Sequence, residues 1–232
     1  MNLAILQARM TSSRLPGKVM APVLGEPMIG RQAERLRRAR RIDKLIVATS
    51  TDPSDDPLAT YCESLELTVF RGSLNDVLER YRAALSAYPE ATAVVRLTAD
   101  CPLADPILID RVIEHHHATG ADYTSNTLGT RTYPQGLDTE VIRPGALVDA
   151  AGRASDPYER EHVTPYIYRR PDTYRLAGVA RRESLAALRW TVDFPDDLAF
   201  VRDVYGKLYP ADPAFGADAV AALPVNTSRP PA

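Results

Sequence analysis

A cluster of basic and hydroxyl-bearing side chains lies near the N-terminus, directly after an apolar segment. The residues from Arg9 to Lys18 include three cations, three hydroxyl groups and one glycine. Arginine supplies forked hydrogen-bond donors, lysine a mobile point charge, and exposed backbone N–H groups can complete the enclosure of an anion. In an open α/β sheet, the loop after a buried strand borders the ligand crevice. This composition favours a binding loop for a triphosphate, with an exposed basic loop as the alternative.

The loop matches neither of two common phosphate-binding motifs. Gly17-Lys18 is followed by Val19, and no glycine lies five residues before Gly17, so the segment is not a Walker loop. A Gly-x-Gly-x-x-Gly dinucleotide fingerprint is also absent from the chain.

Two aspartates follow apolar runs elsewhere in the chain. Asp100 comes after the run 93–97, and Asp193 comes after the run 188–192. Hard divalent cations prefer carboxylate oxygens, and the end of a strand can hold such a group rigidly next to bound phosphates. Each residue taken alone could instead be a helix cap or a turn residue.

Length and charge exclude several classes of protein. The 232 residues fit one large domain, and the formal net charge of −2 gives no general attraction for nucleic acid or anionic membranes. The first 44 residues contain ten Lys/Arg against three Asp/Glu, an excess that suits a small anion such as a phosphate chain. Two separated cysteines, no signal peptide and no apolar run of membrane length predict a cytoplasmic protein.

Short apolar runs alternate with longer amphipathic segments, the pattern of a mostly parallel sheet covered by helices. We expect strands at 3–7, 45–48, 69–70, 93–97, 173–179 and 187–192, with strands and turns in 121–143. We expect helices at 27–41, 55–65, from an N-cap near Ser73, and at 106–118, 156–169 and 195–208. Residues 226–232 are expected to form a frayed tail.

The segment from Ala8 to Lys18 resembles the N-terminal signature of cytidylyltransferases that make CMP-linked acidic sugars, such as CMP-Kdo synthetase. The chain is most similar to the spore coat polysaccharide biosynthesis protein F branch of that superfamily. The resemblance runs from about residue 3 to 205, with supporting segments at 70–81, 96–103, 136–141, 156–167 and 189–193.

This resemblance implies one α/β nucleotidyltransferase domain over residues 1–232. Its Rossmann-like, mostly parallel GT-A-type sheet would carry helices on both faces and a smaller acceptor-side and dimerisation insertion at 121–179. The implied enzyme is a homodimer that uses CTP, Mg²⁺ or another divalent cation, and a small acidic acceptor.

The resemblance also implies roles for individual residues. Asp100 and Asp193 would hold the metal, although Ala99 and Phe194 depart from the residue types usual beside them. Catalysis would rest on Arg9, Arg14, Lys18 and Asp100. The nucleotide would contact Gln7, Ala8, Arg9, Ser12, Ser13, Arg14, Lys18, Gly72, Asp76 and Thr98.

Four further residues are candidates for binding the acceptor. Asp138 and Glu140 alternate on an expected strand and therefore share a face, where they could bind sugar hydroxyls, assist a metal or face solvent. Arg160 and His162 lie two apart in an expected helix, so we expect one at the site and the other at a subunit contact. A structural role is the alternative for His162.

Two other groups of residues are expected to be solvated. The run 115–117 contains three consecutive histidines, which diverge on a helix and so make a poor metal site. The arginines between 35 and 41 are expected to form an exposed helix face, since no aromatic residues accompany them as a platform for nucleic acid.

The reaction implied is a direct displacement, in which an acceptor oxygen attacks the α-phosphorus of CTP and pyrophosphate leaves. Three alternatives remain: a cytidylyltransferase with a phosphate or phosphonate acceptor, a metal-dependent glycosyltransferase, and a non-catalytic nucleotide-binding protein. The chain lacks the Asp-x-Asp typical of the glycosyltransferase, and its basic and acidic residue set argues against the non-catalytic protein.

Overall fold

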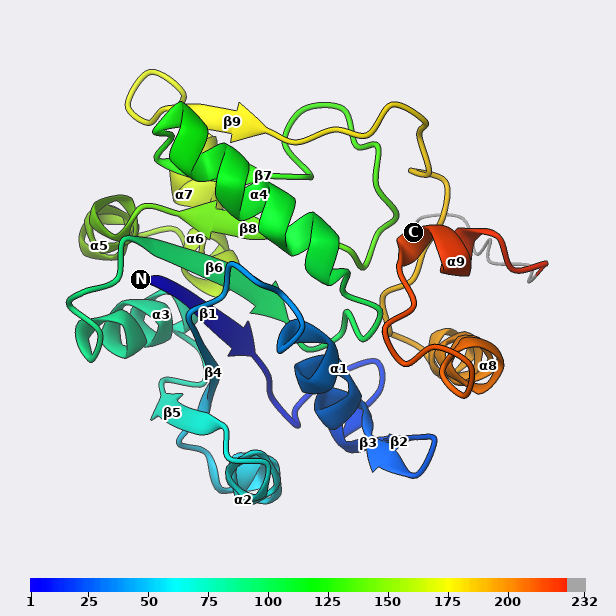
Figure 1. The fold of residues 1–232 in the computed structure, drawn as a ribbon. Coiled ribbons are helices and arrows are strands. Elements are labelled where there is room, and N and C mark those ends of the chain that lie inside the picture. The colour runs from blue at the N-terminus through cyan, green and yellow to red at the C-terminus, as the bar shows by residue number, and fades with distance from the viewer. Residues whose placement is uncertain (225–232) are drawn as a thin grey trace.

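A seven-stranded sheet forms the centre of the computed structural model, which describes residues 1–224 (Figure 1). Its parallel half consists, in spatial order, of β5 (Thr68–Gly72), β4 (Lys44–Ser50), β1 (Asn2–Gln7) and β6 (Ala93–Thr98). The sheet continues with β8 (Glu140–Ile142) antiparallel to β6, β7 (Tyr123–Ser125) antiparallel to β8, and β9 (Leu176–Gly178) parallel to β7. The expected tail at 226–232 lies outside the described residues.

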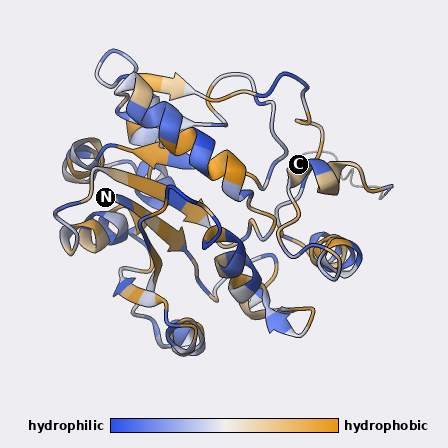
Figure 2. Cartoon of the chain, in the orientation of Figure 1, coloured by the Kyte–Doolittle hydropathy of each residue, from blue (hydrophilic) through white to orange (hydrophobic). Residues whose placement is uncertain are grey.

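Helices cover both faces of this sheet, because alternate residues of the buried strands point to opposite sides. Ala4, Leu6 and Val95 pack with α1 (Met28–Leu36), α2 (Asp56–Ser64), α4 (Pro106–Thr119), α8 (Pro195–Leu208) and α9 (Ala217–Ala221). Leu3 and Ile5 pack on the other face with α3 (Val77–Ser86), α5 (Pro144–Arg153) and α7 (Pro165–Tyr168). Figure 2 shows that hydrophobic residues predominate in the central strands of the sheet. The mostly parallel α/β fold predicted from the sequence is confirmed.

The prediction of a strand at 187–192 is wrong. This segment forms only an isolated bridge between Gln135 and Arg189. Its backbone groups bond to loops instead, since Trp190 N–H donates to Gln135 O at 2.7 Å and Val192 N–H to Asp100 O at 2.8 Å. The apolar run is therefore buried against the loops after β6 and before β8, where it holds Asp193 in place.

Several helix boundaries differ from the predictions. The first helix ends at Leu36, and the segment 156–169 is two short helices, α6 (Pro157–His162) and α7, separated by Val163 at φ 72°. The helix expected from Ser73 begins at Val77, because Asp76 accepts a hydrogen bond from Glu79 N–H and is the N-cap. Not predicted from the sequence were α5, α9, the hairpin of β2 (Pro22–Val23) and β3 (Glu26–Pro27), and the short 3₁₀ helices η1 (Lys18–Met20) and η2 (Pro53–Asp55).

Two residues expected to face solvent are buried. His116 on α4 hydrogen-bonds to Thr124 of β7 at 3.0 Å, and burial lowers its pKa to about 4, so it is neutral near pH 7. Arg35 donates to Ala104 O and Phe215 O and lies over the Phe215 ring. Its guanidinium therefore ties α1 to the C-terminal region.

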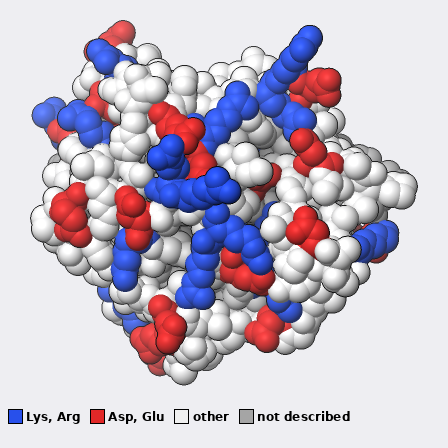
Figure 3. Space-filling model, viewed as in Figure 1, with Lys and Arg blue, Asp and Glu red and all other residues white. Residues whose placement is uncertain are grey.

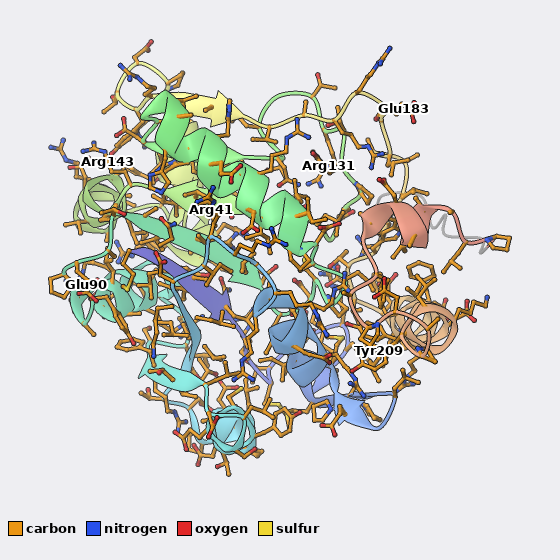
Figure 4. All side chains as sticks on the ribbon, viewed as in Figure 1. Arg41, Glu90, Arg131, Arg143, Glu183 and Tyr209 are labelled. Carbon is orange, nitrogen blue, oxygen red and sulfur yellow. The ribbon has the colours of Figure 1, made fainter. Side chains whose placement is uncertain are left out.

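The charged residues that do face solvent on this side of the molecule include both signs. Figure 3 shows basic and acidic side chains interspersed over the face that carries α1 and α4. Arg41, labelled in Figure 4, pairs with Glu114 of α4 at 2.7 Å. Within residues 1–224, no helix has the length and apolar character needed to cross a membrane.

We predict that Gly136 is required for stable packing of the segment that carries Asp193. Gly136 has φ 104°, and an added Cβ would lie 2.5 Å from the backbone nitrogen of Thr191. Gly136→Ala should lower the free energy of unfolding by about 2–4 kcal/mol, measured by urea denaturation, since both strain and overlap oppose it.

Gly206→Ala is the matched control, because an added Cβ on this α8 residue meets nothing within 4 Å. It should raise the free energy of unfolding by about 0.5–1 kcal/mol, the usual gain from replacing a helical glycine. Equal effects of the two substitutions would show that the contact between 136 and 191 is not tight.

Candidate active site

The loops that follow β1 and β6 meet at one edge of the sheet. The two strands are paired in parallel with Gln7 opposite Thr98, so their carboxyl ends lie together. A hydrogen bond of 2.9 Å from Ala99 N–H to Gln7 O continues this pairing past the strand ends. The basic loop 9–18 and the loop that carries Asp100 are adjacent for this reason.

Lys18 connects these loops to the segment before α8. Its side chain is 10% exposed, and its ammonium donates to Val192 O at 2.6 Å, Asp193 Oδ1 at 3.0 Å and Asp100 Oδ2 at 3.4 Å. The residue stands at the start of η1, after Gly17 in the left-handed conformation with φ 71°. That turn directs the lysine inward, where one buried cation joins two carboxylates that are distant in sequence.

Asp193 accepts from cations on several sides. Arg14 lies 2.8 Å and Arg189 2.6 Å from its carboxylate, in addition to Lys18. Burial alone would raise the pKa of Asp193, but the hydrogen bonds from Arg189 and Lys18 outweigh it, and the pKa lies below its usual value. Asp193 is therefore an anion at neutral pH.

Two adjoining cavities open at this edge. The loop cavity, of about 380 Å³, is lined by the segment after β1, Val77, the end of β6, Asp193, Glu161 and His162. The sheet cavity, of about 610 Å³, lies over β6, β7 and β8 and extends to α6 and α7. The residues that line both cavities form their junction: Arg14, Arg96, Thr98, Asp100, His162 and Asp193.

Most residues predicted for nucleotide or metal binding line the loop cavity. They are Gln7, Ala8, Arg9, Ser12, Ser13, Arg14, Lys18, Thr98, Asp100 and Asp193. Gly72, Asp76 and Arg160 do not line either cavity. Arg160 instead pairs with Asp76 at 2.7 Å, and both border a separate hollow beside Arg9.

The predicted acceptor residues Asp138, Glu140 and His162 line the sheet cavity. Asp138 precedes β8 and forms a two-pronged pair with Arg131 at 2.7 and 3.1 Å. Figure 4 labels Arg131, which lies on the connection between β7 and β8. Glu140 accepts from Tyr123 and Thr164 at one carboxylate oxygen and from Arg96 at the other.

Several residues that line the sheet cavity were not predicted as site residues from the sequence, among them Arg96, Arg131, Tyr158 and Tyr168. For Arg96 a signal was available, because an arginine inside the apolar run 93–97 needs a partner. Arg131, Tyr158 and Tyr168 reach the cavity only through the path of the segment 126–168.

The two aspartates form a donor set that fits a hard divalent cation. Asp100 has a side chain 32% exposed, and it and Asp193 both line the two cavities. Among residues 1–224, no third acid, histidine or cysteine joins them as a cluster of three. Mg²⁺ is commonly bound by one or two carboxylates together with substrate phosphates and water, so two protein ligands suffice here.

The chain belongs to the cytidylyltransferase family, whose model matches residues 3–209. The spore coat polysaccharide biosynthesis protein SpsF of Bacillus subtilis (strain 168) is 34% identical over 212 residues, which cover 88% of this chain and 86% of that protein. The 3-deoxy-manno-octulosonate cytidylyltransferase of Yersinia pseudotuberculosis serotype O:1b is 32% identical over 170 residues, covering 68% and 65%.

A solved cytidylyltransferase from Leptospira borgpetersenii serovar Hardjo-bovis has the same fold. It superposes with a TM-score of 0.89 at 27% identity and covers 95% of this chain and 92% of that one. These comparisons confirm the family resemblance seen in the sequence, and the protein is a CTP-dependent nucleotidyltransferase by family.

We predict that Asp100→Asn abolishes turnover of CTP without unfolding the protein. Asp100 is partly exposed and its pair with Lys18 is long, so the loss of its charge costs little stability. Lys18→Ala should lower the rate by on the order of 10²–10³, as expected for one preorganised charge stabiliser. Pyrophosphate release and thermal unfolding are the two measurements.

Asp203→Asn is the control, since this surface residue pairs only with Lys207 one helical turn away among the described residues. Asp193→Asn is a less clean variant, because the buried cations around it lose a charged partner at a cost of about 3 kcal/mol. Near-normal turnover by Asp100→Asn would place the metal site elsewhere.

Proposed function

We propose that this enzyme transfers CMP from CTP to an acidic sugar and releases pyrophosphate. The observation that carries the proposal is the pairing of Lys18, in the loop cavity, with Asp100 and Asp193 at the junction of the loop cavity and the sheet cavity. Such a junction lets a bound nucleotide and an acceptor meet at one set of charged groups.

The loop cavity suits the nucleotide. Three cations from the loop 9–18 line it, Arg9, Arg14 and Lys18, and their charge suits a triphosphate. Arg9 is paired with Glu161 at 3.7 Å with both side chains partly exposed, so a phosphate can replace Glu161 at low cost. In this proposal the base lies near residues 7–9.

The reaction needs alignment and charge neutralisation more than covalent help from the protein. The acceptor hydroxyl oxygen attacks the α-phosphorus, the bond to the bridging oxygen of the β-phosphate breaks, and pyrophosphate leaves while the hydroxyl proton passes to water. Arg9, Arg14 and Lys18 offset the charge on the departing phosphates. A Mg²⁺ ion held by Asp100 and Asp193 would neutralise phosphate charge and lower the pKa of the acceptor hydroxyl.

The sheet cavity suits the acceptor. Its volume of about 610 Å³ and its lining of Thr127, Gln135, Asp138 and Tyr158 provide room and hydrogen-bond partners for a sugar. Two relatives support a sugar acid as acceptor: one is a 3-deoxy-manno-octulosonate cytidylyltransferase, and the other is named for spore coat polysaccharide biosynthesis. We therefore favour a sialic acid-like or Kdo-like acceptor, with a role in surface polysaccharide synthesis.

A cytoplasmic location forms part of the proposal. Cys62 and Cys101 are buried free thiols, as expected in a reducing compartment.

The first test of this function is nucleotide choice and product. With Mg²⁺ present, calorimetry should show CTP binding more tightly than ATP, GTP and UTP, and pyrophosphate release should require an added acceptor. Kdo, N-acetylneuraminate and a phosphonate are the acceptors to compare.

Equal affinity for the four nucleotides would contradict the cytidylyl assignment. Turnover with the phosphonate alone would contradict the sugar acceptor and leave the nucleotide assignment standing. Removal of the divalent cation with EDTA should abolish turnover in every case, because the phosphates and the acceptor hydroxyl would then lack the cation that neutralises charge and lowers the hydroxyl pKa.

We also infer a homodimer, with 121–179 as its interface region. Tyr158 and Val148, at 46% and 50% exposure, are among the few large apolar side chains that face solvent in the described chain. Aromatic residues are enriched at interface cores, and two-fold pairing is the commonest assembly.

Light scattering at micromolar concentration should give a mass near 51 kDa, twice the 25.5 kDa of the chain. A fully active monomer would contradict this inference.

A further inference from the structure

Arg96 occupies the junction between the two cavities, on the strand that separates them. It lies on β6, which is next to β8 in the sheet (Figure 1). Arg96 is directly opposite Glu140 in the antiparallel register, so the two side chains share one face of the sheet. Gln7 on the neighbouring strand β1 contacts the same guanidinium. Arg96 lines the loop cavity and the sheet cavity alike.

Glu140 holds this guanidinium in place. One carboxylate oxygen accepts from Tyr123 Oη at 2.6 Å and from Thr164 Oγ1 at 2.7 Å, while the other accepts from Arg96 Nη1. Burial opposes the charged form of Arg96, but the adjacent Glu140 carboxylate outweighs it and raises the pKa of Arg96. Glu140 is thus fully engaged within the protein, which leaves it poorly placed to bind sugar hydroxyls.

The protein uses only part of the hydrogen-bonding capacity of Arg96. Among residues 1–224, Nε has no partner, and Nη2 meets only Gln7 Oε1 at 3.5 Å, which is long for a hydrogen bond. By contrast, both terminal nitrogens of Arg131 donate hydrogen bonds to Asp138, and Arg14 is paired with Asp193. Because its Nε is buried, Arg96 keeps donor capacity for a ligand at Nη2, and unlike the half-exposed Arg14 its guanidinium is largely buried and held by Glu140.

The chemistry of the reaction defines what anion could lie there. In the ring form of a 2-keto sugar acid, the carboxylate is bonded to the anomeric carbon, which also carries the attacking hydroxyl. When that hydroxyl meets the α-phosphate at the junction of the cavities, the carboxylate must lie at the junction too. A fixed guanidinium is the side chain best suited to bind a carboxylate there.

We propose that Arg96 binds the carboxylate of the acceptor and that Glu140 positions Arg96 for this contact. The assignment rests on the proposed function and makes it more specific, because it selects acids whose carboxylate is next to the reacting carbon. A neutral analogue loses the charge-assisted contact, so binding of the acid is favoured by roughly 10- to 100-fold.

The test compares an acid with its uncharged counterpart. N-acetylneuraminate, Kdo and their carboxamides serve as acceptors, and kcat and KM are measured for each alongside the Kd of CTP by calorimetry. The wild-type enzyme should prefer the acid. Arg96→Met should raise the acceptor KM by roughly 10- to 100-fold, remove most of the preference for the acid, and change the Kd of CTP less than about threefold.

Because Arg96→Met leaves a buried carboxylate unpaired, the double variant R96M/E140Q is the main one to measure, since it removes both charges together. Its thermal unfolding should stay near that of the wild type, and its preference for the acid should be lost. Glu140→Gln alone keeps the cation but loosens it, so the acceptor KM should rise while the preference is retained. Arg131→Met, in the same cavity and likewise paired with an acid, should retain the preference.

Three results would overturn the assignment while the proposed function stands: retained preference in R96M/E140Q, a loss that falls on CTP binding instead of on the acceptor, or loss of preference in Arg131→Met. No turnover by the wild type with any acid would overturn the proposed function and this assignment with it.

Discussion

The buried ammonium of Lys18 is the contact on which the arrangement of the site depends. It joins the loop after β1, the loop after β6 and the segment before α8 through bonds to Asp100, Val192 and Asp193. The pairing of β1 with β6 and the bond from Val192 N–H to Asp100 O bring these segments together, and the shared cation then holds the two carboxylates next to each other. A divalent cation and phosphate oxygens bound there would meet carboxylates that are already held together.

The surroundings of this contact differ on its two sides. Toward the loop cavity, Arg9 and Arg14 are partly exposed, and a phosphate can replace Glu161, the partner of Arg9, at low cost. Toward the sheet cavity, Arg96 is held by the acid opposite it, within a network that includes Tyr123 and Thr164. One side can therefore adapt to a flexible triphosphate, while the other presents fixed groups to an acceptor. This difference matches a reaction that needs in-line alignment of two substrates.

How much of the fold and the site could be predicted from the sequence depends on whether a residue contacts its neighbours in the chain or distant residues. The strands at 3–7, 45–48 and 93–97 were predictable because buried parallel strands are continuous apolar runs. The ends of the strands 3–7 and 93–97 also indicated that the loop with Lys18 and the loop with Asp100 border one edge of the sheet, whereas Asp193 reaches that edge although the strand expected before it does not form. The segment 187–192 looks like a strand, yet its partners are loops. His116, Arg35 and the pair of Arg160 with Asp76 depend on contacts between distant residues, which local pattern does not encode.

A crystal structure with CTP and Mn²⁺ is the most direct test of the account, because the anomalous signal of Mn²⁺ locates the metal without interpretation of weak density. The account predicts an anomalous peak within 2.0–2.4 Å, roughly the usual metal–oxygen range, of carboxylate oxygens from both Asp100 and Asp193, with the triphosphate against Arg9, Arg14 and Lys18. A peak remote from both aspartates, or a triphosphate outside the loop 9–18, would contradict it.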